Sequence, residues 1–291
     1  HCLSWVSHSG VVAPQPFSNK GADWLTTFGG GLVTTCGLNH VGGPEADAFG
    51  ERGVHGPISN IPATIVSVIQ PDPLAGNMDF SITGIMKQSQ ALGERLELKR
   101  TISGILGEAA IHIHDEVSNR GNTPAPHMLL YHCNLGWPLA NDGAQLIWKG
   151  QWQAREAHPK IFTPGNDFHF RKPPLEEHNG GGEEAAFIDA TADGNGEVKC
   201  GLYNEQLGIA ICIAYNKIQL PWLTNWQHWG TGEYVTGLEP GTHPPIGQAK
   251  ARAQGTLIEL LPGETRYYDL RIEVLNDAKR IEEFLNTHNN N

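Results

Sequence analysis

Basic residues are scarce in this sequence of 291 residues. Twenty Lys and Arg stand against 31 Asp and Glu, the net charge is −11, and no Lys/Arg stripe is present. A protein that binds a phosphate backbone needs such a basic surface, so we expect no nucleic-acid partner. The sequence also lacks a run of 18 apolar residues and a basic-then-apolar leader. We therefore expect a soluble protein that neither spans a membrane nor is exported.

Cysteine pairing motifs are absent as well. The five cysteines are odd in number and form no C-x-x-C pair; they are Cys2, Cys36, Cys133, Cys200 and Cys212. Such a set fits reduced thiols better than a disulfide framework or a zinc knuckle. This pattern predicts a cytoplasmic protein.

Helical periodicity is nearly absent, whereas short apolar or alternating runs separated by turn formers recur along the chain. The predicted strands are Thr64–Ile69, Met78–Ile85, Arg95–Ile102, Ala109–Val117, His127–Tyr131, Glu197–Leu202, Ile209–Tyr215, Thr256–Leu261 and Tyr267–Val274. Many strands without interleaved helices predict an all-β fold, a large antiparallel β-sandwich. The exception is a short C-terminal helix over Asp277–Thr287, in which Ile281, Phe284 and Leu285 share one face.

Residues 1–291 are expected to form a single domain, because no repeat or linker divides the chain. The Gly-, Glu-, Asp- and Pro-rich stretch Pro164–Asn195, which includes Gly180–Gly182, predicts a long loop. The chain begins abruptly at His1–Trp5 without a strand. This start leaves open that N-terminal strands of the fold are missing.

Histidine is unusually frequent, with 14 in the chain, and two clusters invite a functional interpretation. In "ERGVHGPISN", His55 is flanked by Arg52 and Gly56 in a tight polar turn, which suits either a binding site or an ordinary turn. In "IHIHDE", His112, His114 and Glu116 project from one face of a predicted strand. They could hold a divalent metal, or they could simply form a polar sheet face.

Two further stretches combine polar groups with tryptophan. In "MLLYHCNLGWP", His132 ends a predicted strand, with Asn134 and Trp137 beside it; this suits a sugar, although an isolated histidine here would more often be structural. In "PWLTNWQHWGTGEYVTGLEPG", an aromatic cluster includes Trp226 and His228. Glu239 follows the strand-like Glu233–Leu238 and precedes a Pro-Gly turn. It is placed either to face a cleft or to face solvent.

Taken in order, these motifs resemble the galactose mutarotase-like (aldose 1-epimerase) superfamily, and more closely its bacterial aldose epimerase-like branch. "VHGPISN" resembles the motif that supplies a substrate-binding histidine, here His55. Pro126 precedes His132 by six residues, as in the strand that supplies the general acid, and "TGLEPG" resembles the motif that supplies the general base, here Glu239. "LIELLPGETRYYDLRIEV" resembles the terminal hairpin. The resemblance runs from about Phe28 to Val274 and implies a galactose mutarotase-like sandwich.

The resemblance is incomplete at two places that concern substrate recognition. The superfamily's Arg-x-x-x-Asn-Arg motif is replaced by "TTCGLNHVGG", where Asn39 persists and the arginine role falls to Arg52 or is lost. The aromatic residues after the acid histidine are shortened to Cys133-Asn134-Leu135. The expected substrate-binding residues are His55, Asn39, Arg52, His114, Asn134 and Trp226.

The implied activity is the interconversion of sugar anomers by acid/base ring opening, with Glu239 as base and His132 as acid. This chemistry requires no cofactor and no metal. It predicts an ionised glutamate beside a protonated histidine, a monosaccharide substrate that is free or modified, and a monomer or homodimer. Two alternatives stay open: a non-catalytic sugar-binding protein on the same fold, and a metal-dependent sugar isomerase that uses His112, His114 and Glu116. A glycosidase is disfavoured because the best carboxylate pairs with a histidine rather than with a second carboxylate.

Overall fold

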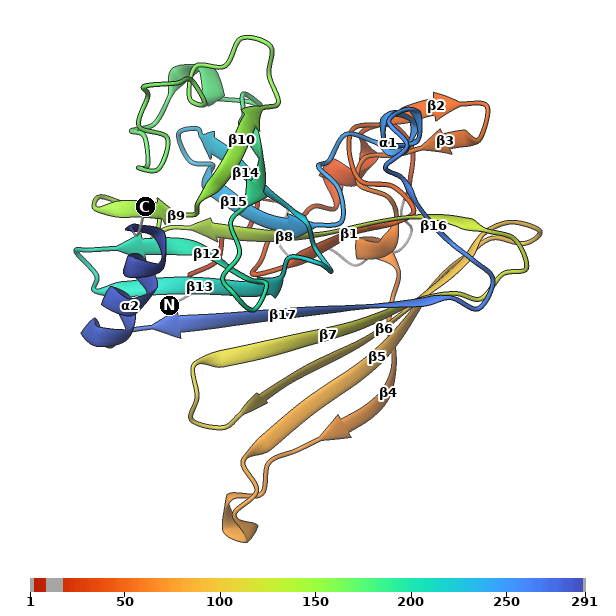
Figure 1. Cartoon of the computed structure of the whole chain (residues 1–291), viewed down its shortest axis with the longest axis horizontal. Coiled ribbons are helices and arrows are strands. Elements are labelled where there is room, and N and C mark those ends of the chain that lie inside the picture. Colours follow the sequence, from red (N-terminus) through yellow and green to blue (C-terminus); the bar gives the residue numbers. More distant parts are fainter. Residues whose placement is uncertain (1–2, 9–17, 290–291) are drawn as a thin grey trace.

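The computed structural model of the chain describes residues 3–8 and 18–289, so His1 and Cys2 of the abrupt start lie outside it. In the described residues nearly all regular structure is antiparallel β-strand, arranged as two large packed sheets and one small ribbon (Figure 1). The all-β expectation is confirmed.

The first large sheet has the strand order β1-β8-β15-β14-β11-β10, with β16 also paired to β8. Its strands are β1 (Thr34–Leu38), β8 (Ala125–Gly136), β10 (Gly150–Ala154), β11 (Glu184–Ala190), β14 (Trp222–Trp229), β15 (Tyr234–Gly241) and β16 (Ile258–Leu260). The ribbon pairs β2 (Glu45–Asp47) with β3 (Gly50–Arg52).

The second large sheet has the order β4-β5-β6-β7-β17-β13-β12-β9. Its strands are β4 (Thr64–Ile69), β5 (Asp79–Ser89), β6 (Arg95–Ile105), β7 (Ala110–Asn119), β9 (Ala144–Ile147), β12 (Glu197–Asn204), β13 (Ile209–Asn216) and β17 (Thr265–Leu275). The α-helices are α1 (Gln248–Ala253) and α2 (Ala278–Asn289), and short 3-10 helices span Asp23–Thr26, Ile58–Asn60, Pro73–Ala75 and Glu176–His178.

Strand β8 is mostly apolar and is buried on both faces. Leu129, Tyr131 and Cys133 pack into the main core between the two large sheets. Met128 and Leu130 point the other way and pack in a smaller cluster around Trp24. The alternation of side chains along a strand therefore puts His132 on the face of the first sheet that is turned away from the main core.

The tail forms the expected helix. Ile281 and Phe284 of α2 pack on Ala210, Cys212 and Leu275 at one end of the second sheet, where Figure 1 shows α2 beside β12 and β13. This packing explains why the apolar residues of the tail share one face. None of the helices in the described part of the chain is long and apolar enough to cross a membrane.

The stretch Pro164–Asn195 is not a continuous loop, because its second half contains β11. The burial pattern of β11 is almost uninterrupted, with only Asp189 exposed among its seven residues. A strand covered on both faces lacks the polar alternation that would reveal it in the sequence.

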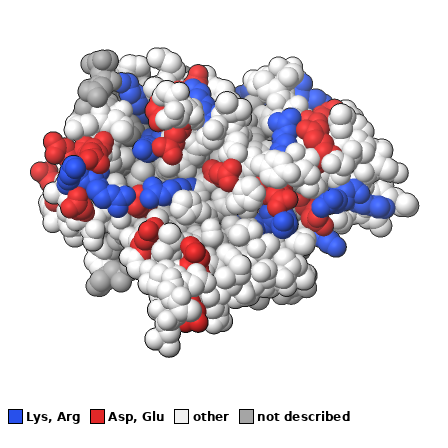
Figure 2. All heavy atoms as spheres, turned by 60° about the horizontal axis from the view of Figure 1, so that its bottom comes forward, with Lys and Arg blue, Asp and Glu red and all other residues white. Residues whose placement is uncertain are grey.

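The charged residues of the surface form no basic band on the face drawn in Figure 2. Lys and Arg side chains are interspersed there with Asp and Glu.

Candidate active site

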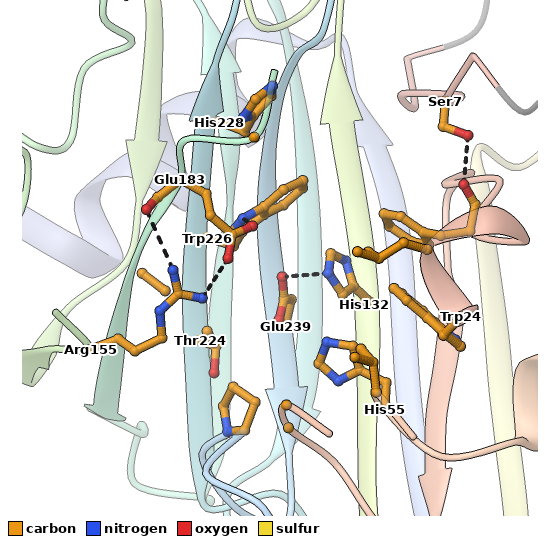
Figure 3. A pocket seen from close by; sticks show the side chains of 18 of the residues that line it. Ser7, Trp24, His55, His132, Arg155, Glu183, Thr224, Trp226, His228 and Glu239 are labelled. Carbon is orange, nitrogen blue, oxygen red and sulfur yellow. Dashed lines mark hydrogen bonds and ion pairs between the residues drawn. The ribbon is translucent and has the colours of Figure 1, made fainter. Parts of the chain in front are cut away.

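A cavity of about 670 Å³ lies on the outer face of the first sheet. Three neighbouring strands, β8, β15 and β14, form its floor. Side chains at alternate positions of β14 all line it, namely Thr224, Trp226 and His228. Figure 3 shows these groups with His132, Glu239 and His55 around one hollow.

His132 and Glu239 are brought together by strand register. β8 and β15 pair antiparallel with Leu238 opposite Cys133, so Glu239 lies beside His132. His132 Nε2 is 3.2 Å from Glu239 Oε1, and both side chains are buried, with 7% and 3% exposed. Both residues lie inside their strands, not at the strand ends that the sequence predicted, because β8 and β15 continue beyond the expected apolar runs.

Gly237 leaves the space that the Glu239 carboxylate occupies. Gly237 precedes Glu239 by two residues and therefore shares its face of β15. A Cβ atom at Gly237 would collide with Glu239 Oε1 and approach Trp226 Cε3 to 3.3 Å. The missing side chain of Gly237 thus lets the carboxylate fold back along the strand toward His132.

Burial opposes charge on both members of the pair. Desolvation raises the pKa of Glu239 well above its usual value, with a further contribution from Glu183, and it lowers the pKa of His132 to about 4. In the substrate-free cavity burial therefore disfavours both the carboxylate and the imidazolium. The expected ionised glutamate beside a protonated histidine is opposed by burial and needs stabilisation by a bound ligand.

His55 reaches the cavity from a tight turn. It has a φ of 55°, and Gly56, at 68°, is required because a Cβ there would collide with the Gly37 carbonyl. The Gly37 N–H donates to the His55 carbonyl at 2.8 Å, which fixes the turn against β1. Burial lowers the pKa of the imidazole to about 3, so His55 is neutral at physiological pH.

Four buried polar atoms of the cavity are unsatisfied. His55 Nδ1, His132 Nδ1, Thr224 Oγ1 and Glu239 Oε1 have no hydrogen-bond partner among the described residues, although Glu239 Oε1 lies 3.2 Å from His132 Nε2. Burying such an atom without a partner costs about 1–3 kcal/mol. A ligand that carries several hydroxyl groups would satisfy these atoms.

Aromatic rings form the remaining walls near His132. The Phe28 ring centroid lies 5.1 Å from the His132 ring and 4.5 Å from Trp24, with which it stacks. The Trp226 ring meets His132 edge-on at 5.3 Å. Aromatic faces next to hydrogen-bonding groups suit a sugar ring, which has both C–H faces and hydroxyls.

Four of the expected binding residues do not line this cavity. Arg52 is taken up by Glu45 and Asp47, each at 2.6 Å. The Asn39 amide donates to Glu94 Oε2 at 2.6 Å. Their polar groups are therefore committed to the structure around the ribbon and to the β5–β6 turn.

Asn134 and His114 are also placed elsewhere. Asn134 is fully buried and donates to the carbonyls of His132 and Gly31, so it supports β8 from within. His114 lies on the second sheet in a separate pocket and pairs with Asp269 at 2.7 Å. The spacing of His114 correctly puts it on a polar sheet face, but that face is not the one that carries His132.

The arrangement around β7 gives no support to the metal alternative. Glu116 pairs with Lys99 at 2.6 Å, while His114 pairs with Asp269. Within residues 3–8 and 18–289, no group of three or more His, Cys, Asp or Glu side chains is placed to hold a metal ion.

Sequence reasoning missed several residues of the cavity. Trp24 and Phe28 lie in a segment without strand periodicity, and Arg155 follows a short, partly exposed strand. Glu183 comes directly after Gly180–Gly182. Only Thr224 left a usable signal, because it precedes Trp226 by two residues and must share its face if the segment is a strand.

Comparisons with solved structures support the fold. A Klebsiella pneumoniae protein that carries the provisional name aldose 1-epimerase has a TM-score of 0.85 and 24% identity, over 99% of this chain and 74% of that chain. A galactose mutarotase-like protein from Clostridium acetobutylicum has a TM-score of 0.59 and 12% identity, over 85% and 80% of the two chains. At these identities the likeness shows the fold, which is galactose mutarotase-like.

A comparison with curated proteins found no match. The family model described as a domain of unknown function, DUF4432, matches residues 1–274. The chain therefore belongs to the DUF4432 family and has a galactose mutarotase-like fold.

Proposed function

We propose that this protein is an aldose 1-epimerase-like isomerase that interconverts the anomers of a monosaccharide, with Glu239 as general base and His132 as general acid. The observation that carries the proposal is the buried His132–Glu239 contact at 3.2 Å on the floor of a cavity with aromatic walls. The names of the solved proteins with this fold support it.

The reaction needs only proton transfers. Glu239 takes the proton of the anomeric hydroxyl as the bond from the anomeric carbon to the ring oxygen breaks, and His132 protonates that oxygen. The product is the open-chain carbonyl form. Rotation about the C1–C2 bond exposes the other carbonyl face. As the ring closes, His132 takes its proton back from the attacking hydroxyl and Glu239 gives its proton to the carbonyl oxygen, which restores both groups.

A proton shift within the His132–Glu239 pair makes this cycle compatible with the buried site. A neutral imidazole beside a protonated carboxyl and an imidazolium beside a carboxylate carry the same number of protons. They differ only by a proton shift across the 3.2 Å contact. Sugar hydroxyls that donate to the carboxylate and accept from the imidazolium would offset the cost of burying the charged form. His55 and Thr224 would hold further hydroxyls, and Trp24 and Trp226 would contact the ring.

The pair can be tested by substitutions that remove each titrating group but keep a polar side chain. We expect Glu239→Gln and His132→Gln each to lower the catalysed rate of anomer exchange by about 10²–10⁴, the usual contribution of a general acid or base. Sugar binding should persist, because the shape of the cavity is retained. Saturation-transfer NMR gives the exchange rate, and Glu282→Gln on the exposed side of α2 is the control.

An exchange rate that is unchanged in Glu239→Gln would remove the proposed base. Wild-type protein that binds sugars without accelerating exchange would instead be the non-catalytic sugar-binding protein of the alternative.

A further inference from the structure

The cavity contains one arginine, and its charge is more than compensated. Arg155 Nη1 is 2.8 Å from Glu183 Oε1, and its Nε donates to Glu156 Oε1 at 2.5 Å. Two carboxylates thus contact one guanidinium, which leaves a net negative charge at this end of the cavity. Figure 3 shows Arg155 and Glu183 joined across the floor from His132.

Both carboxylates are held by further donors. The Trp226 indole N–H donates to Glu183 Oε2 at 2.7 Å, and the Ala185 N–H donates to Glu156 Oε2 at 3.2 Å. The loop before Glu183 is itself fixed, because His228 Nδ1 donates to the Gly182 carbonyl at 2.6 Å. An anionic group of a ligand would therefore have to displace a carboxylate that is itself held by hydrogen bonds before it could bind Arg155.

Nothing else in the lining supplies a fixed positive charge at neutral pH. Arg155 is the only Lys or Arg among the described residues that line the cavity. His55 and His132 are uncharged there, since burial lowers their pKa values to about 3 and 4. Glu233 adds another carboxylate to the lining, with His8 Nε2 and His228 Nε2 at 3.7 and 3.9 Å from it.

We propose that Glu183 determines the charge specificity of the site: by occupying Arg155, it excludes phosphorylated and carboxylated sugars and restricts the cavity to uncharged ones. An anionic group would find the guanidinium donors taken and would meet uncompensated negative charge in a site partly screened from water. This inference rests on the proposed function, because it assigns the substrate class of the same cavity.

The test compares matched sugars. Neutral aldoses are each paired with the 6-phosphate and the uronate of the same sugar, and binding is measured by saturation-transfer NMR and by tryptophan fluorescence. We expect wild-type protein to bind the neutral form at least tenfold more tightly. Glu183→Gln, and more strongly Glu183→Gln with Glu156→Gln, should raise affinity for the anionic forms tenfold or more. Added salt should reduce that gain.

The matched control is Glu282→Gln, which removes one negative charge far from the cavity and should leave the preference unchanged. Wild-type binding of an anionic form as tight as that of its neutral partner would overturn the inference, and so would the absence of any gain in both glutamine variants. Selective binding of neutral sugars without anomer exchange would support this inference while refuting the proposed catalysis. Failure to bind any sugar would refute both.

Discussion

At the scale of single residues, the position of the proposed base, Glu239, depends on a glycine. Gly237 leaves the space into which Glu239 folds. We expect Gly237→Ala to displace the carboxylate and to lower the rate of anomer exchange at least tenfold. The melting temperature should change little, because the new methyl group meets the end of a flexible side chain. Retained exchange in a folded Gly237→Ala variant would show that the observed position of Glu239 is not needed.

A second residue-scale prediction concerns acid stability. His127 is fully buried; its Nδ1 donates to the Leu38 carbonyl at 2.9 Å, so its Nε2 accepts from the Tyr268 hydroxyl at 2.7 Å. Burial lowers its pKa to about 3. Below about pH 6.5 His127 takes up a proton in the unfolded chain but stays neutral in the folded chain. The free energy of unfolding therefore falls as the pH falls from about 6.5 toward 3.

One such histidine costs about 2 kcal/mol between pH 7 and pH 5. His127→Gln retains a donor and an acceptor but cannot titrate. We expect urea unfolding to show a loss between these pH values that is smaller by about this amount in the variant. An equal loss in variant and wild type would mean that His127 is protonated in the folded protein.

The residues of the site were predictable where a motif of the resembled family or a cluster of aromatic residues marked them in the sequence. His132, Glu239, His55 and Trp226 all line the cavity that the structure describes. Arg52 and Asn39 do not, because Glu45, Asp47 and Glu94 engage them. Such partners are distant in sequence or lie across a turn, and no local pattern shows which polar group a given residue will meet.

At the scale of elements, one buried cluster links the two large sheets. Arg100 on β6 makes two hydrogen bonds with Asp115 on β7, at 2.8 and 2.6 Å. From the first sheet, the Tyr131 hydroxyl of β8 donates to Asp115 at 2.7 Å, and Thr35 of β1 accepts from Arg100 at 2.7 Å. The cluster holds β8, and with it His132, in position against the second sheet.

Asp115→Asn should destabilise the fold by about 3 kcal/mol, since it removes the fully buried partner of the Arg100 guanidinium, whose side chain is only 16% exposed. Glu116→Gln is the neighbouring control; it breaks the partly exposed pair with Lys99 and should cost less than about 1 kcal/mol. Urea unfolding measures both. Similar losses for the two variants would argue against a structural role for the buried cluster.

A strand was predictable from the sequence when its residues alternate between apolar and polar or form an unbroken apolar run. β4 was predicted to the residue, and the other predicted strands differ from the structure only at their ends. The strands that were not predicted are β1, β2, β3, β9, β10, β11 and β14. In β14 the polar residues are buried as well: Asn225 and Gln227 point into the interior and bond to each other at 3.0 Å. A polar residue inside the core interrupts the pattern on which sequence prediction depends.

At the scale of the whole molecule, the sheet order places the cavity. β8, β15 and β14 are neighbours in one sheet although β14 and β15 follow β8 by about 90 residues. The antiparallel pairing of β8 with β15 in this sheet brings His132 beside Glu239. The order of motifs along the chain indicated this arrangement through its resemblance to galactose mutarotase-like proteins, whereas composition and periodicity alone indicated a β-sandwich without a site.

The most direct test of the central claim is anomer exchange catalysed by the wild-type protein. Saturation-transfer NMR on a panel of neutral aldoses and ketoses, without added metal or cofactor, compares exchange with and without protein at neutral pH. The account predicts that at least one uncharged sugar exchanges its anomers faster than the spontaneous rate, in proportion to protein concentration. Spontaneous rates for every sugar, including those that the protein demonstrably binds, would contradict it.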